Sequence, residues 1–185
     1  MSTQTYQGIL PVVSYEDASP EAQRIFDQLK ASMGRVPKMY AAQSYSSLSL
    51  GAKLALDSEL GKGVLHGLPK EVIALAVSQV NGSDYCLAAH TMLAKMQGAS
   101  DAEILNFRRG TSDDEKLAAL AAMAHEIAES RGYPSQQTVE HFFAVGYDRA
   151  ALVELIGLVA LNVWNNYTNH IAQTPIDFPP APELA

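Results

Sequence analysis

Apolar residues recur three or four positions apart along most of this chain, and serine, aspartate, proline or glycine bounds each such run. That spacing puts the apolar side chains on one face of a helix, and those residue types start and stop helices. β-Branched residues do not alternate with polar ones, so no strand is predicted. The pattern predicts an all-α bundle of roughly eight to nine helices, at about 20–34, 37–40, 47–61, 68–81, 83–96, 100–110, 112–131, 135–146 and 148–172.

Several predicted helix starts carry specific capping signals, and the first is Ser19, a hydroxyl cap followed by Pro20. Ser83 follows the break at Asn81-Gly82 and is predicted to cap the next helix with its hydroxyl. Residues 100–103 and 112–115 each have the serine and glutamate of a capping box. We predict one domain over residues 1–185, with its core at about 50–130. An N-terminal helical extension precedes this core, and a C-terminal helix and a proline-rich tail follow it.

Composition narrows the class of protein. The net charge is −7 and the sequence pI is about 5.1, which argues against binding nucleic acid or an anionic membrane, since both need clustered lysine and arginine. The most apolar run, residues 152–164, contains Glu154 and Asn162 and is too short to cross a bilayer. The start of the chain lacks a signal-peptide pattern, and one free cysteine fits a reducing compartment, so a cytoplasmic protein is expected.

The stretch from Glu71 to His90 concentrates the residues with chemical potential. Cys86, the only cysteine, falls in the first turn of a predicted helix, where free backbone N–H groups and the helix dipole favour a thiolate. His90 lies one turn later on the same face and could take up the thiol proton. If the break after residue 81 folds the two helices together, Glu71 would approach His90 and orient it.

Each of these residues also has a purely structural interpretation. A lone cysteine is more often a small buried hydrophobe than a nucleophile, and a lone histidine is often a structural residue. Glu71 alone would be a first-turn carboxylate that stabilises its helix. Asn165, Asn166, Asn169 and His170 cluster near the end of the last helix. They could line a pocket or a subunit contact, but a polar helix end is the default interpretation.

The phrase EVIALAVSQVNGSDYCLAAH resembles the AhpD-like alkylhydroperoxidases of the carboxymuconolactone decarboxylase superfamily. Their pattern is a glutamate followed by Cys-x-x-Cys-x-x-x-His, and Glu71, Ser83, Cys86 and His90 occupy those four positions. Residues 34–37 and 175–177 resemble the longer, peroxidase-related members. The resemblance implies packed helices that assemble as homotrimers or homohexamers, and an antioxidant activity that reduces hydroperoxides with a dithiol of the dihydrolipoamide or thioredoxin type.

The resemblance also implies roles for the four residues. Cys86 would attack the peroxide, and His90 with Glu71 would relay the proton. Ser83 stands at the position of the resolving cysteine, where a hydroxyl cannot condense with a sulfenic acid into a disulfide. Either this is a natural one-cysteine member or a serine has replaced a cysteine, and the otherwise complete phrase favours replacement. Turnover would then require an outside thiol.

Two other functions remain open. A carboxymuconolactone decarboxylase-like enzyme would not need Cys86 and would carry a basic side chain in its pocket, and no lysine or arginine lies between Glu71 and His90. A non-catalytic, redox-sensing helical oligomer would oxidise Cys86 once without turnover. No cofactor is expected. No metal site is predicted either, because His125 and His141 have no ligand-spaced partner.

Overall fold

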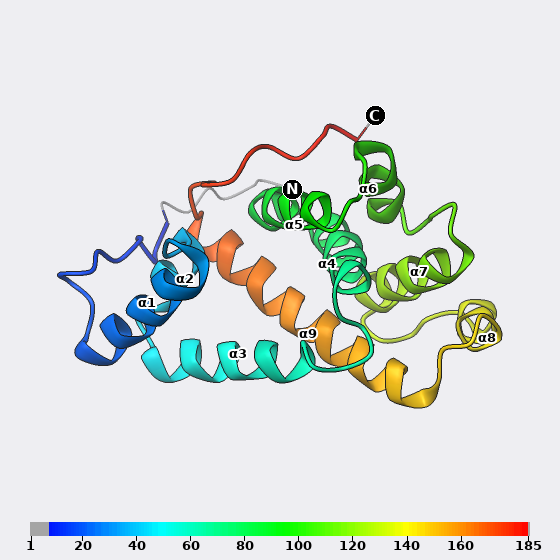
Figure 1. The fold of residues 1–185 in the computed structure, drawn as a ribbon, viewed down its shortest axis with the longest axis horizontal. Coiled ribbons are helices and arrows are strands. Elements are labelled where there is room, and N and C mark those ends of the chain that lie inside the picture. Colours follow the sequence, from blue (N-terminus) through cyan, green and yellow to red (C-terminus); the bar gives the residue numbers. More distant parts are fainter. Residues whose placement is uncertain (1–7, 185) are drawn as a thin grey trace.

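The computed structural model describes residues 8–184 and confirms the all-α prediction, since this part of the chain has helices and no strand. Figure 1 shows the arrangement of the helices. Their bounds are α1 Pro20–Met33, α2 Lys38–Gln43, α3 Ser47–Leu60, α4 Leu68–Asn81, α5 Asp84–Met96, α6 Asp101–Arg108, α7 Glu115–Ser130, α8 Gln136–Ala144 and α9 Arg149–Ala172.

Helix α4 is the centre of the fold. It contacts α5, α6, α7 and α9, and its residues 72–77 are completely buried. Such a helix cannot be amphipathic, which is why this stretch of the sequence is almost uniformly apolar. The long helix α9 runs diagonally across the molecule (Figure 1). It contacts α2 and α3, and α1 packs against α3.

One predicted capping box is wrong, and one predicted N-cap residue makes no side-chain hydrogen bond. The Ser100 capping box is present, with the Glu103 carboxylate accepting from the Ser100 backbone N–H at 2.8 Å. At α7 the cap is Asp114, whose carboxylate accepts from the Leu117 backbone N–H at 2.8 Å, so residues 112–115 form no capping box. Ser83 occupies the N-cap position of α5, but its hydroxyl makes no capping hydrogen bond.

The C-terminal tail is tied to the rest of the protein at two points. After α9 it runs over α5 towards α6 (Figure 1). Arg35 donates to the Asp177 carboxylate at 2.8 Å and its guanidinium lies over the Phe178 ring at 4.5 Å. Further along, Arg108 donates to the carbonyl of Pro182. Ser83 and Cys86, at the start of α5, lie close to the end of α9 and to the tail.

Within residues 8–184, no helix is long and apolar enough to cross a membrane.

Candidate active site

The predicted approach of Glu71 to His90 is confirmed. His90 Nδ1 lies 2.7 Å from Glu71 Oε2, although 19 residues separate them in sequence. Gly82, at φ 67, makes the turn between α4 and α5 that brings the first turn of α4 against α5. The carboxylate fixes the imidazole orientation by accepting from the Nδ1–H, which leaves Nε2 to accept a proton. The pair is thus arranged as an oriented general base.

Cys86 lies in the first turn of α5, one turn before His90, as predicted. The cysteine is only 2% exposed and packs in a small cluster with Met39 and Tyr85. The side-chain amide of Asn169 donates towards Cys86 Sγ and towards Met39 Sδ, each at 3.2 Å. A hydrogen-bond donor aimed at sulfur stabilises a thiolate more than a thiol, so Asn169 joins the site.

Ser83 lies at the predicted N-cap position of α5, but its hydroxyl does not cap the helix. The residue is 1% exposed, and its hydroxyl has no hydrogen-bond partner among residues 8–184. Its backbone still caps α5, because the Ser83 carbonyl accepts from the Leu87 N–H at 2.9 Å. A buried hydroxyl without a partner has lost its water hydrogen bonds and gained nothing in return. The position therefore suits a less polar side chain, such as a thiol, better than it suits serine.

The asparagines of α9 are buried, so their default interpretation as a polar helix end is wrong. Asn166 donates to Ser78 Oγ at 3.1 Å and accepts from Asn81 at 2.8 Å, which fastens α9 to the end of α4. His170 Nε2 lies 3.3 Å from the Gly82 carbonyl. Residues 162, 165, 166 and 169 recur at helical spacing, and this stripe is the sequence signal that would have placed them on the inner face.

A cavity of about 280 Å³ opens beside the histidine. Apolar side chains form much of its wall, including Leu29, Met33, Leu54, Leu93 and Phe178. The polar and charged side chains that line it come from α2, α3, α4, α5 and α9, and they are Tyr40, Lys53, Asp57, Lys70, Glu71, His90, Asn162 and Asn165. Tyr85 lines the cavity beside Tyr40. Cys86 packs with Tyr85 in one cluster, and Tyr40 packs against that cluster.

Lys53 is the residue that the sequence analysis missed. It is 1% exposed, and its ammonium donates to Tyr40 Oη at 3.3 Å and lies 3.9 Å from Asp57. Burial lowers the pKa of Lys53, and the Asp57 carboxylate partly offsets this. The available signal was its spacing, because position 53 follows the buried Leu50 by three residues on the same helical face.

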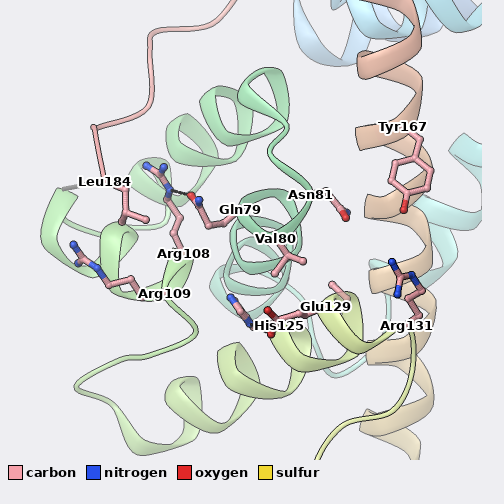
Figure 2. A pocket seen from close by; sticks show the side chains of 11 residues that line it. Gln79, Val80, Asn81, Arg108, Arg109, His125, Glu129, Arg131, Tyr167 and Leu184 are labelled. Carbon is pink, nitrogen blue, oxygen red and sulfur yellow. Dashed lines mark hydrogen bonds and ion pairs between the residues drawn. The ribbon is translucent and has the colours of Figure 1, made fainter. Parts of the chain in front are cut away.

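A second, more open cleft of about 580 Å³ lies away from these residues. Figure 2 shows Arg109 and Arg131 at opposite ends of it, with His125 and Glu129 between them. Arg108 is turned away to Gln79, to which it donates at 2.8 Å. The positive charges do not converge on one point, so we place the site at the smaller cavity. Among the residues that the structure describes, no group of three or more histidine, cysteine, aspartate or glutamate side chains could hold a metal ion.

Comparisons with known proteins agree with this fold. Residues 55–129 match the Carboxymuconolactone decarboxylase family. The uncharacterized protein YdfG of Bacillus subtilis (strain 168) is 27% identical over 123 residues, which cover 62% of this chain and 82% of YdfG. The structure of the alkylhydroperoxidase AhpD core of an uncharacterized peroxidase-related protein from Ralstonia eutropha JMP134 superposes with a TM-score of 0.80 at 15% identity, covering 90% of each chain. A debrominase, Bmp8, in complex with 2,3,4-tribromopyrrole has a TM-score of 0.75 at 19% identity, over 96% of this chain and 94% of Bmp8.

The fold is therefore that of the AhpD-like helical proteins. The match over residues 55–129 shows that this part of the chain is similar to the Carboxymuconolactone decarboxylase family.

Proposed function

We propose that this protein is a thiol-dependent hydroperoxide reductase in which Cys86 is the nucleophile. The observation that carries the proposal is the chain of groups at the α4–α5 junction. Cys86 lies one turn before His90, whose Nδ1 is held at 2.7 Å by the carboxylate of Glu71. Peroxide reduction needs a sulfur nucleophile and a proton carrier, and these are the roles proposed for Cys86 and His90.

The reaction follows from these groups. His90 takes the proton of the Cys86 thiol, and the Glu71 carboxylate stabilises the imidazolium that forms. The thiolate attacks one peroxide oxygen, the O–O bond breaks, and Cys86 becomes a sulfenic acid. The leaving alkoxide takes the proton back from His90 and departs as an alcohol. Two thiol groups of an external reductant then return the sulfenic acid to a thiol, releasing water and a disulfide.

The external reductant is required because Ser83 stands where a resolving cysteine would lie. We propose a small or protein-bound dithiol for this role, and a homotrimer or homohexamer as the assembly. Cys86 is 2% exposed, so either reactant must approach through the Tyr40–Tyr85 wall of the cavity or by movement of the tail that covers it.

The test is peroxide consumption in the presence of a dithiol, with the natural chain, Cys86→Ala and Ser83→Cys compared under one set of conditions. We expect slow turnover by the natural chain, faster turnover by Ser83→Cys, and none by Cys86→Ala. If none of the three consumes peroxide above the uncatalysed rate, the redox function is wrong.

The cavity also favours a second candidate, an acid–base enzyme of the carboxymuconolactone decarboxylase type. An enzyme of that type is predicted to carry a basic side chain in its pocket. Lys53 and Lys70 both line the cavity, together with the Glu71–His90 pair. The sequence between residues 71 and 90 gave no hint of this, because both lysines precede it. The similarity to a debrominase is a further reason to test more than one reaction. A Cys86→Ala chain that keeps full activity on a carboxylate substrate would favour this candidate.

A further inference from the structure

Lys53 is a buried cation whose charge is poorly neutralised. Its closest carboxylate oxygen, Asp57 Oδ2, is 3.9 Å away. The other oxygen of that carboxylate is 2.6 Å from Lys70 Nζ, so the Asp57 carboxylate is shared between the two lysines. The remaining neighbour of the Lys53 ammonium is the neutral phenol of Tyr40, which accepts its hydrogen bond at 3.3 Å. Burying an ammonium group is costly unless an anion accompanies it.

The other charged groups of the cavity are already paired. Glu71 accepts from His90 at 2.7 Å, and Asp57 accepts from Lys70 at 2.6 Å. Burial raises the pKa of Tyr40 to about 12, so its hydroxyl keeps its proton and can donate it to an incoming anion. With a neutral His90 the two lysines and the two carboxylates of the cavity balance in number, but Lys53 is the less closely paired lysine, since its nearest carboxylate oxygen is 3.9 Å away.

An independent feature of the same cavity also indicates a ligand. Asn165 lines the cavity and is 7% exposed, and its side-chain oxygen has no hydrogen-bond partner within the described part of the chain. Buried amide oxygens are almost always paired, so this one is suited to an O–H group of a bound molecule. The opposite wall is apolar, with Leu29, Leu54 and Leu93 among its side chains.

We propose that this cavity binds an organic monocarboxylate with an apolar chain. The carboxylate accepts hydrogen bonds from Lys53 Nζ and Tyr40 Oη, and the chain lies along the leucine-rich wall. Where the bound molecule is also the substrate, the inference rests on the proposed function and names its substrate class, a hydroperoxide of a carboxylic acid. The hydroperoxide O–H would then be the donor that Asn165 lacks.

The test measures binding rather than turnover, with octanoate as the probe and 1-octanol as its neutral counterpart. Titration calorimetry uses the natural chain and Cys86→Ala, which removes the reactive thiol. Lys53→Met keeps the length of the side chain and removes its charge. Lys62→Met is the matched control, because this exposed lysine lies just after the same helix and pairs with Glu59.

We expect octanoate to bind the natural chain and Cys86→Ala equally. Lys53→Met should weaken octanoate binding by at least about tenfold, the usual effect of losing a charge-assisted hydrogen bond, and should leave octanol binding within about twofold. Tyr40→Phe should weaken octanoate binding several-fold. Lys62→Met should change neither ligand.

The inference is overturned if octanoate does not bind, if octanol binds as tightly as octanoate, or if Lys53→Met binds octanoate like the natural chain. Thermal melting of Lys53→Met shows whether the variant is folded, and Tyr40→Phe gives a second reading that does not remove the lysine. Since octanoate carries no peroxide, binding that persists in a chain without peroxidase activity supports the ligand class and counts only against the proposed reaction.

Discussion

Ser83 gives the sharpest prediction about stability. Its hydroxyl is buried and unpaired within residues 8–184, between the end of α4 and the first turn of α5. A buried hydrogen-bonding group without a partner costs about 1–3 kcal/mol, because its hydrogen bonds to water in the unfolded chain are not replaced. Substitutions that remove the hydroxyl should therefore stabilise the protein.

The magnitude follows from what replaces the oxygen. In Ser83→Cys the thiol is a much weaker donor and acceptor, so most of the desolvation cost disappears, while the larger sulfur adds some crowding in a packed region. Ser83→Ala removes the hydroxyl and leaves a small void. We expect each substitution to raise the free energy of unfolding by about 1 kcal/mol, which for a chain of this size raises the Tm by about 2–4 °C.

Scanning calorimetry in a reducing buffer measures this directly, with both variants compared with the natural chain. Higher Tm values for both variants agree with an unpaired hydroxyl, and unchanged values contradict the expected stabilisation. A lower Tm for both variants refutes it, since the hydroxyl must then make a hydrogen bond that stabilises the fold. Peroxide treatment of Ser83→Cys adds a chemical reading, because mass spectrometry should show the loss of two hydrogen atoms as the new thiol condenses with oxidised Cys86.

Three further predictions concern the site and its cover. Glu71→Gln keeps the size of the side chain but removes the charge that stabilises protonated His90, so stopped-flow measurement should show Cys86 reacting with peroxide about 10²-fold more slowly, and an unchanged rate would exclude Glu71 from the relay. Asp177→Asn weakens a partly exposed ion pair that holds the tail, so alkylation of Cys86 by iodoacetamide should accelerate by about two- to fivefold, whereas no change would mean that the tail does not limit access. Burial raises the pKa of Tyr40 to about 12 while the unfolded chain loses that proton near pH 10. Its contribution to stability is therefore present below about pH 10 and lost as the pH rises towards 12. Urea unfolding at about pH 8 and about pH 11 should show a smaller loss of stability for Tyr40→Phe than for the natural chain, and equal losses would contradict the assignment.

The helices were predictable because their signals are local. Ser19 before Pro20, the Ser100 capping box and the glycines at 34 and 82 act on the residues beside them, and the structure places helix ends there. The two exceptions have different causes. At residues 112–115 the Asp114 carboxylate takes the capping role predicted for Ser112, and at Ser83 the buried hydroxyl makes no bond to the free N–H groups.

The contents of the cavity were not predictable in the same way, since they depend on contacts between distant helices. Glu71 and His90 could be brought together in advance because one short turn joins their helices. Lys53 reaches the same cavity from α3, and no local pattern states how α3 lies against α4 and α9. A lysine on an apolar helical face more often extends its charge to water than buries it. The burial of the Lys53 ammonium could therefore be found only from the three-dimensional structure.

His90 connects the two halves of the site, and this decides how the candidate functions are told apart. Its ring lines the cavity that holds Lys53, its Nδ1 is fixed by Glu71, and it lies one turn from Cys86 behind the cavity wall. Loss of His90 would therefore impair peroxide reduction and acid–base chemistry alike, and cannot distinguish them.

The variants Cys86→Ala and Lys53→Met can distinguish the candidate functions. A thiol peroxidase acting on hydrogen peroxide loses its activity with the first change and keeps it with the second. An acid–base enzyme acting on a carboxylate shows the reverse. A peroxidase whose substrate is a carboxylate hydroperoxide is impaired by both, with the second change raising KM more than it lowers kcat, because the lysine binds a group distant from the breaking O–O bond.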